Sequence, residues 1–217
     1  MNNLLPGLRK FTREVFPDLR PEFENLSKGQ TPHTLFITCS DSRVVPNLLT
    51  QTAPGEIFLV RNAGNIVPPF GASRGGEEAA IEFAVDGLKV TNIVICGHTH
   101  CGAMAALLTP EKLENLPAMK KWLQHASAAR KRIEVIRRKE DRGLLDVIEE
   151  NILVQAENLK THPSVSAATR EKRIRIYGWV YHFENGTVDI YDPIAEKFIS
   201  STSVKEEAAK DVARFSL

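Results

Sequence analysis

Three short apolar runs most strongly limit the folds open to this chain. They are Thr34–Cys39, Glu56–Arg61 and Asn92–Cys96, each of strand length and rich in Ile, Val, Phe or Thr. Between the second and the third, Gly75–Leu88 is rich in helix-forming residues and carries apolar side chains at helical spacing. The order strand, helix, strand predicts a parallel sheet covered by helices.

The segments on either side of this unit complete the expected fold. Residues 2–16 have the apolar spacing of an amphipathic helix, which we expect to form an N-terminal arm that covers a partner subunit. A longer helix is expected from about Leu144 to Leu159. Near the C-terminus, Arg173–Phe183 and Thr187–Tyr191 flank an Asn-Gly dipeptide, which predicts an antiparallel hairpin at the sheet edge.

These expectations define the fold class as α/β. We predict a central four-stranded parallel sheet with an antiparallel edge addition, flanked by helices and preceded by an N-terminal helical arm. The sequence shows no internal repeat and no shift in composition that marks a linker. A single domain over residues 1–217 is therefore expected.

The charge balance argues against a nucleic-acid or membrane partner. The chain has 28 Lys and Arg against 27 Asp and Glu, a formal net charge of +1, so it has no strong overall field. The densest basic run, Ala129–Arg142, is expected to be a solvated helix face. No stretch approaches the ~20 apolar residues of a membrane span, and the N-terminus lacks the pattern of a secretory signal. We expect a cytoplasmic protein.

Two clusters of candidate metal ligands follow predicted strands. Cys39 ends the first apolar run and is followed by Ser-Asp-Ser-Arg, whereas His98 and Cys101 come directly after the third run. Loops that leave the carboxyl ends of neighbouring parallel strands meet at one edge of a sheet, so both clusters can build one site. Three cysteines are too few, and odd in number, for a disulfide framework.

Two thiolates and one imidazole suit zinc, and they are one ligand short of a closed structural site. An open position holds a water molecule whose pKa the metal lowers toward neutrality, which indicates hydration or hydrolysis. Cys96 and His100 are competing ligands within the same run. Cys96 continues the apolar strand and is expected in the core, and His100 is expected beside the site or toward solvent, where it could carry a proton.

The motifs CSDSR at 39–43, RNAGNIVPP at 61–69 and HTHC at 98–101 resemble the signatures of beta-class carbonic anhydrases, and the resemblance extends from about Leu4 to Phe198. Gln30, nine residues before the first cysteine, makes the chain most similar to the plant-like and bacterial type.

The resemblance implies zinc-dependent, reversible hydration of carbon dioxide to bicarbonate. It implies Cys39, His98 and Cys101 as zinc ligands with water or hydroxide as the fourth, and Asp41 with Arg43 as a catalytic dyad. A bidentate pair with Arg43 would keep Asp41 ionised and off the metal, so that Asp41 accepts a hydrogen bond from the hydroxide.

For the substrate pocket we expect residues that can surround a small apolar molecule and its bicarbonate product. These are Gln30, Val44, Phe58, Phe83 and Gly102. Plant relatives usually carry tyrosine in place of Phe83, and both phenylalanines could instead be ordinary core residues. Relatives in which a glutamine such as Gln30 reaches the neighbouring subunit imply a homodimer or a larger homo-oligomer.

Two other functions remain open at this point. The same fold and metal could hydrolyse carbon disulfide or carbonyl sulfide, or the metal could only stabilise a catalytically silent zinc-binding module. A stopped-flow assay of carbon dioxide hydration, with the two sulfur compounds as alternative substrates, separates these possibilities.

Overall fold

The structure, a computed structural model, describes residues 4–73, 75–136 and 143–204 of the 217-residue chain. It divides into two compact units, one that ends at Thr31 and one that begins at Pro32. The first unit consists of the helix α1 (Leu4–Lys10), a π-helical segment (Phe11–Val15) and the helix α2 (Phe16–Leu26). The prediction of one domain over the whole chain stays a prediction.

The described residues of the N-terminal unit form a helical arm without a core of its own. The helix predicted over residues 2–16 is confirmed from Leu4 onward and continues to Leu26, while its first two residues lie outside the described ranges. None of the residues of α1 and α2 is buried. Its exposed large apolar residues are Leu4, Leu5, Leu8, Phe11 and Val15. Such a face is stable in water only when another surface covers it.

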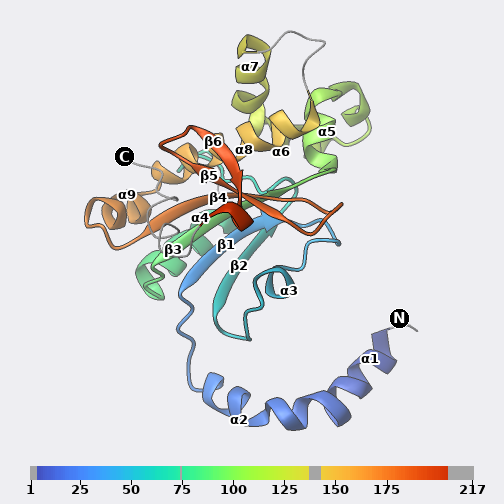
Figure 1. The fold of residues 1–217 in the computed structure, drawn as a ribbon, viewed down its shortest axis with the longest axis vertical. Coiled ribbons are helices and arrows are strands. Elements are labelled where there is room, and N and C mark those ends of the chain that lie inside the picture. The colour runs from blue at the N-terminus through green and yellow to red at the C-terminus, as the bar shows by residue number, and fades with distance from the viewer. Residues whose placement is uncertain (1–3, 74, 137–142, 205–217) are drawn as a thin grey trace. The chain divides into compact units, whose positions relative to one another are not determined.

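Within the described part of the second unit, six strands form one sheet in the order β2-β1-β3-β4-β5-β6 (Figure 1). The first four strands in this order are parallel, and β5 and β6 add antiparallel. The bounds are β1 Thr34–Cys39, β2 Ile57–Asn62, β3 Asn92–His98, β4 Arg175–Tyr181, β5 Val188–Asp192 and β6 Lys197–Ser200. The predicted four-stranded parallel sheet with an antiparallel edge is therefore confirmed.

One detail of this prediction is wrong. The segment Arg173–Phe183 was expected as part of the antiparallel addition, but its strand β4 is the fourth parallel strand and pairs with β3. The turn signal correctly makes β4 and β5 antiparallel to each other, but it carries no information about which of them joins the sheet. The strand β6 lies in a segment where no strand was predicted.

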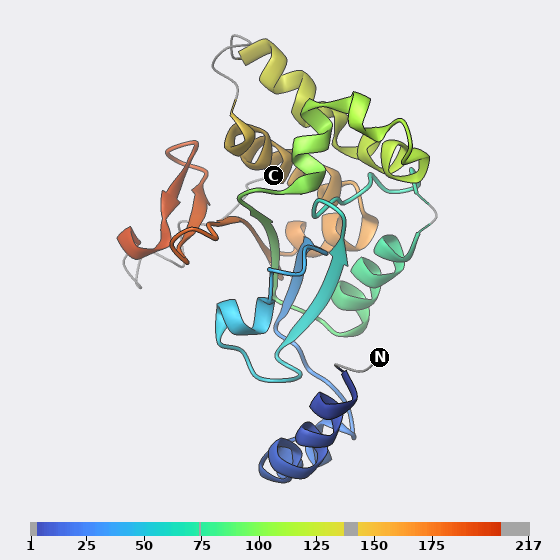
Figure 2. The same ribbon diagram turned by 90° about the vertical axis from the view of Figure 1, so that its right-hand side faces the viewer.

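Helices cover the sheet mainly on one face. In Figure 2, α3 lies on one side of the parallel strands and α4 on the other. The helices predicted over Gly75–Leu88 and from Leu144 are confirmed, and the basic run forms a helix up to Ile136, beyond which it lies outside the described residues. The α-helices are α3 Pro46–Thr50, α4 Gly76–Glu82, α5 Gly102–Leu108, α6 Pro117–Trp122, α7 Ser127–Ile136, α8 Leu144–Lys160 and α9 Pro163–Arg170. A π-helical segment (Phe83–Gly87) continues α4, and 3₁₀ turns span Pro110–Leu113, Leu123–Ala126 and Ser201–Ser203.

The two faces of the sheet have unequal cores because successive strand residues point to opposite sides. On one face, strand residues such as Leu35 and Ile95 join helix residues such as Ile152 in the main apolar cluster. On the other, Phe36, Val94 and Cys96 form a much smaller one. The prediction that Cys96 belongs to the core is confirmed, and its burial raises the pKa of the Cys96 thiol to about 12.

The strand order determines which edge of the sheet can hold a ligand. The chain passes from β1 to β2 on one side of β1 and then crosses to β3 on the other side, so the loops that follow β1 and β3 diverge. This reversal opens a crevice at the carboxyl ends of β1 and β3, the usual ligand position in parallel sheets. Among the described residues, no helix is both long and apolar enough to cross a membrane.

The close approach of α8 to β3 yields a stability prediction. A Cβ atom at Gly97 would lie 3.0 Å from Ile148 and 3.1 Å from Ile152 of α8. Gly97→Ala is therefore expected to lower the unfolding free energy by about 1–3 kcal/mol, measured by urea denaturation.

Gly76→Ala is the matched control, because a Cβ there meets no atom within 4 Å and the residue is helical. It is expected to leave stability unchanged or to raise it by up to about 1 kcal/mol. Equal denaturation midpoints for the two variants would contradict this account of the packing.

Candidate zinc site

Three potential metal ligands meet at the crevice between β1 and β3. Cys39 is the last residue of β1, His98 is the last residue of β3, and Cys101 directly precedes α5. One ligand atom from each lies within 4.8 Å of the others, and all three residues are buried. The structure thus brings the three sequence-predicted ligands together.

The protonation of His98 leaves one ring nitrogen free for a metal. Its Nδ1 lies 2.8 Å from the carbonyl oxygen of Thr99, and because a carbonyl can only accept, Nδ1 carries the proton. The other nitrogen, Nε2, is fully buried and has no hydrogen-bond partner among the described residues. A buried imidazole nitrogen is costly without a partner. A metal ion facing Nε2 removes this cost, and metal-bound histidines commonly donate their second N–H in this way.

The two thiols also have the chemistry of a metal site. A hydrogen bond from the Cys101 thiol is the largest cause of a lowered pKa at Cys39, and the Gly64 N–H, 3.3 Å from the Cys39 sulfur, acts in the same direction. The same hydrogen bond raises the pKa of Cys101, because the Cys101 thiol loses this bond when it gives up its proton, and burial acts in the same direction. A divalent cation bound by both sulfurs would stabilise both thiolates, so this donor set fits zinc.

Asp41 and Arg43 form a bidentate pair beside the ligands. Arg43 Nε donates to Asp41 Oδ1 over 2.9 Å and its NH2 group donates to Oδ2 over 2.8 Å, while the Arg43 backbone N–H donates to Oδ1 over 3.0 Å. These bonds hold the pKa of Asp41 well below its usual range. Asp41 Oδ2 lies 3.9 Å from His98 Nε2. An ionised hydrogen-bond acceptor therefore faces the ligand cluster.

The loop after β1 is held by Arg61 of β2. Its Nε donates to the Cys39 carbonyl over 3.2 Å and its NH2 group donates to the Asp41 carbonyl over 2.8 Å. One guanidinium thus fixes the backbone on both sides of Ser40. Arg61 was not among the predicted site residues, although its place in the RNAGN motif beside the sheet edge was a usable signal.

A buried amide network from α8 supports the loop after β2. Asn151 donates to the Gly64 carbonyl over 3.1 Å, Gln155 accepts from the Val67 N–H over 2.8 Å, and Asn158 donates to the Val67 carbonyl over 2.9 Å. Because Gly64 also donates to the Cys39 sulfur, this network reaches a metal ligand. The sequence analysis missed it, and the available signal was the polar pair 151 and 155 within an otherwise apolar helical stripe.

Gly64 is a glycine for steric reasons. Its φ is +85°, and a Cβ would lie 2.9 Å from Met104 and 3.0 Å from Ala103. Gly102, in contrast, has no atom within 4 Å of a Cβ position, so it leaves open space beside Cys101.

His100 is exposed, with φ +55°, and its side chain pairs with Glu184 at 2.5 Å.

The predicted pocket residues are distributed unevenly around the ligand cluster. Val44 is buried close to it, with its N–H donating to the Asp41 carbonyl over 3.0 Å. Phe58 lies four residues before Asn62, the partner of Cys39 in the sheet, which is about 13 Å along the strand. Phe83 stacks on Phe58 at 6.0 Å. Both aromatic rings are thus far from the ligands of their own chain.

Gln30 is an exposed residue of the N-terminal unit. Its predicted role in bicarbonate binding stays a prediction, as do the pocket roles of Phe58 and Phe83.

Comparison with known proteins agrees with this site. A family model described as "Carbonic anhydrase" matches residues 34–188. The chain is 47% identical over 191 residues to a carbonic anhydrase of Synechococcus elongatus, covering 87% of this chain and 70% of that protein. The structure of the beta-carbonic anhydrase CcaA superposes with a TM-score of 0.89 at 43% identity, over 92% of this chain and 98% of that one. One of two tetrameric beta-carbonic anhydrases from Sordaria macrospora superposes with a TM-score of 0.68 at 28% identity, over 87% and 92%.

The chain therefore belongs to the carbonic anhydrase family, in its beta class. The comparisons also agree with the α/β fold described above.

The amide network leads to a prediction about the site scaffold. Asn151→Leu removes the donor to the buried Gly64 carbonyl, so it is expected to lower the unfolding free energy by about 1–3 kcal/mol and to weaken zinc retention. Urea denaturation and zinc content after dialysis measure the two effects. Asn115→Leu, at an exposed position, is the control and should change neither. Unchanged zinc retention in Asn151→Leu would show that the amide network does not support the metal site.

Proposed function

We propose that this chain catalyses the reversible hydration of carbon dioxide to bicarbonate and a proton, with zinc held by Cys39, His98 and Cys101. The observation that carries the proposal is the buried Nε2 of His98, which has no hydrogen-bond partner in the described part of the chain and lies beside two thiols and an ionised Asp41. When bound, zinc lowers the pKa of a water molecule toward neutrality and so supplies a nucleophile near pH 7.

Asp41 orients this nucleophile. Its carboxylate faces the ligand cluster and stays ionised, so it accepts a hydrogen bond from the attacking hydroxide and directs a lone pair toward the carbon of carbon dioxide. Arg43 contributes by occupying both oxygens of Asp41, which prevents the carboxylate from turning onto the metal.

Carbon dioxide itself needs an apolar wall and little else. Val44 supplies buried apolar surface next to Asp41, and the open space at Gly102 leaves room beside Cys101. We assign these two residues to substrate binding from within the same chain.

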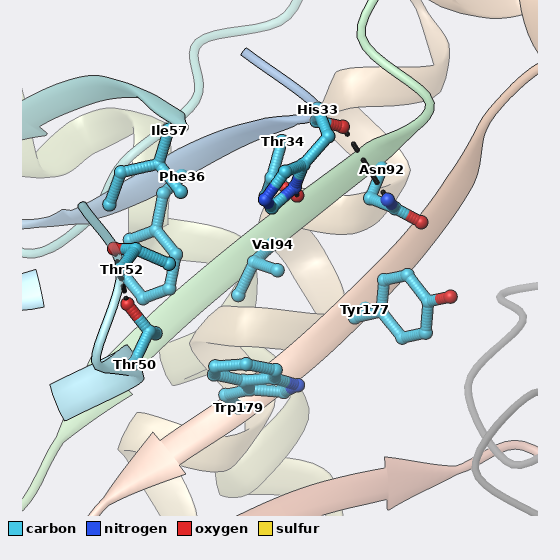
Figure 3. A pocket seen from close by; sticks show the side chains of 10 residues that line it. All are labelled: His33, Thr34, Phe36, Thr50, Thr52, Ile57, Asn92, Val94, Tyr177 and Trp179. Atoms are coloured by element: carbon cyan, nitrogen blue, oxygen red, sulfur yellow. Dashed lines mark hydrogen bonds between the residues drawn. The ribbon is translucent and has the colours of Figure 1, made fainter. Parts of the chain in front are cut away.

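Phe58, Phe83 and Gln30 are assigned to a site formed with a second copy. The two rings lie at the opposite end of β2 from the ligands of their own chain, so a pocket role requires a neighbouring subunit. The arm exposes an apolar face, and the sheet face with the smaller core has a hollow of about 300 Å³ lined by Phe36, Val94 and Trp179 among others (Figure 3). We therefore propose a homodimer or a larger assembly in which the arm covers a partner.

A cytoplasmic location is also proposed. Cys39, Cys96 and Cys101 are all free and buried, which suits a reducing compartment where thiols are not paired.

Asp41→Asn tests the dyad. The amide keeps the size of the side chain but loses the charge that orients the nucleophile, so kcat/KM for hydration is expected to fall about 100-fold. Zinc content is expected to stay at one ion per chain. Stopped-flow hydration and metal analysis on the same preparation measure both.

Asp86→Asn is the matched control, because Asp86 also faces an arginine, Arg173, at 3.6 Å but lies away from the ligands. It should keep full activity. An Asp41→Asn variant as active as the wild type would defeat the role of Asp41. Zinc-loaded wild-type protein that never exceeds the buffer rate would instead favour a silent zinc-binding module.

The assembly proposal is tested on the arm. Replacing Leu4 and Leu8 together by Glu puts charge on its exposed apolar face, so the mass from light scattering is expected to drop toward that of one chain and hydration activity to fall with it. The control is Lys10→Glu, which changes charge on the same exposed helix without removing an apolar side chain. A monomeric wild type with full activity would contradict a shared site.

A further inference from the structure

The segment that follows β4 is clasped to the loop that carries the zinc ligands. His98 and Tyr181 are partners in the parallel pairing of β3 and β4, so the residues after each strand run on side by side. The Thr99 N–H donates to the Tyr181 carbonyl over 2.9 Å, and the Phe183 N–H donates to Thr99 Oγ1 over 3.0 Å. The Thr99 hydroxyl in turn donates to Glu184 over 3.0 Å. These bonds fix Phe183 next to the ligand loop.

The ring of Phe183 contacts both the candidate ligand His98 and the dyad residue Arg43. It lies 4.9 Å from the His98 ring, and the Arg43 guanidinium carbon is 4.5 Å from its centroid. The edge-on packing of Tyr181 at 5.1 Å supports the ring from another side. One aromatic side chain therefore touches a metal ligand and the arginine of the dyad at once.

Arg43 needs such support because its side chain is 52% exposed. An exposed ion pair contributes little and does not by itself hold two side chains in one geometry. Besides Asp41, the described contacts of its guanidinium are the His100 carbonyl at 3.2 Å and the ring of Phe183. A cation that lies over an aromatic face is attracted to the ring. This attraction restricts the guanidinium of Arg43 to a position over Phe183, from which its Nε and NH2 groups point at Asp41.

We propose that Phe183 is a positioning residue for carbon dioxide hydration, which acts through Arg43 on the orientation of Asp41. This role rests on the proposed function, and it goes beyond packing because it predicts that the effect of the ring depends on Arg43. A ring that only packs under the hairpin would affect the protein equally with or without the arginine.

The experiment is a double-mutant cycle on zinc-loaded protein. Phe183→Leu is expected to lower kcat/KM about tenfold with zinc content unchanged, and Phe183→Tyr, which keeps the ring, is expected to recover most of the activity. In the Arg43→Gln background, the same Phe183→Leu change is expected to cost less than about twofold. Phe183→Met, which fills a similar volume without an aromatic face, replaces the leucine variant if that one does not fold.

A second readout does not depend on catalysis. The Arg43 Nε–H, followed by NMR, is expected to exchange with solvent at least about fivefold faster in Phe183→Leu than in the wild type and in Phe183→Tyr, because its hydrogen bond to Asp41 opens more often. Phe198→Leu is the control, since the ring of Phe198 packs against Tyr191 at 5.3 Å between β5 and β6 and contacts neither the candidate ligands nor the dyad. It should leave both readouts unchanged.

The outcomes separate the two proposals. Equal losses from Phe183→Leu in both backgrounds, or unchanged exchange of the Arg43 Nε–H, would overturn the positioning role. In that case an active wild type would leave the proposed function intact. A wild type that does not hydrate carbon dioxide would defeat the proposed function, and the exchange measurement would still show whether Phe183 orders Arg43.

Discussion

The parallel pairing of β1 with β3 is the constraint on which the rest of this structure depends. The two strands are neighbours in space although 52 residues lie between the last residue of β1, Cys39, and the first residue of β3, Asn92, and their register sets Thr38 opposite Cys96. This register makes Cys39 and His98 end their strands at the same edge. A slip of one residue would turn every side chain to the other face and separate the ligands. The register therefore decides where a metal can bind.

Around this edge, side chains from several elements form hydrogen bonds with the backbone of the loops that build the site. His98 donates to its own loop, Arg61 of β2 holds the loop after β1, and α8 supplies side-chain amides to the loop after β2. Each group would be costly if left unpaired in the core. Among the described residues, the remaining exception at the ligand cluster is His98 Nε2, whose position beside two thiols suits it to bind a cation.

The sequence predicted the groups whose chemistry is local. The candidate ligands and the Asp41–Arg43 pair could be picked out because they follow apolar strand runs and form rare combinations of side chains, as in Cys39-Ser-Asp-Ser-Arg. The supports could not be found in this way. Asn151 and Phe183 make their contacts with Gly64 and Thr99, which lie 87 and 84 residues away along the chain, so only the fold reveals them. The role of β4 was missed for the same reason, since turn chemistry fixes a hairpin but not its neighbour.

The two Asp–Arg pairs of this chain show why the surroundings decide function. Asp41 with Arg43 and Asp86 with Arg173 have the same chemistry, and both arginines are substantially exposed. The first pair differs because the Phe183 ring, the His100 carbonyl and the Arg43 backbone N–H restrict it to one bidentate geometry. In the second pair, the two charged groups approach only to 3.6 Å. An exposed ion pair has little stability to contribute, but a restricted one can hold a carboxylate in a single orientation. At Asp41 the surrounding contacts therefore serve orientation, the property that a hydration site requires, more than they serve stability.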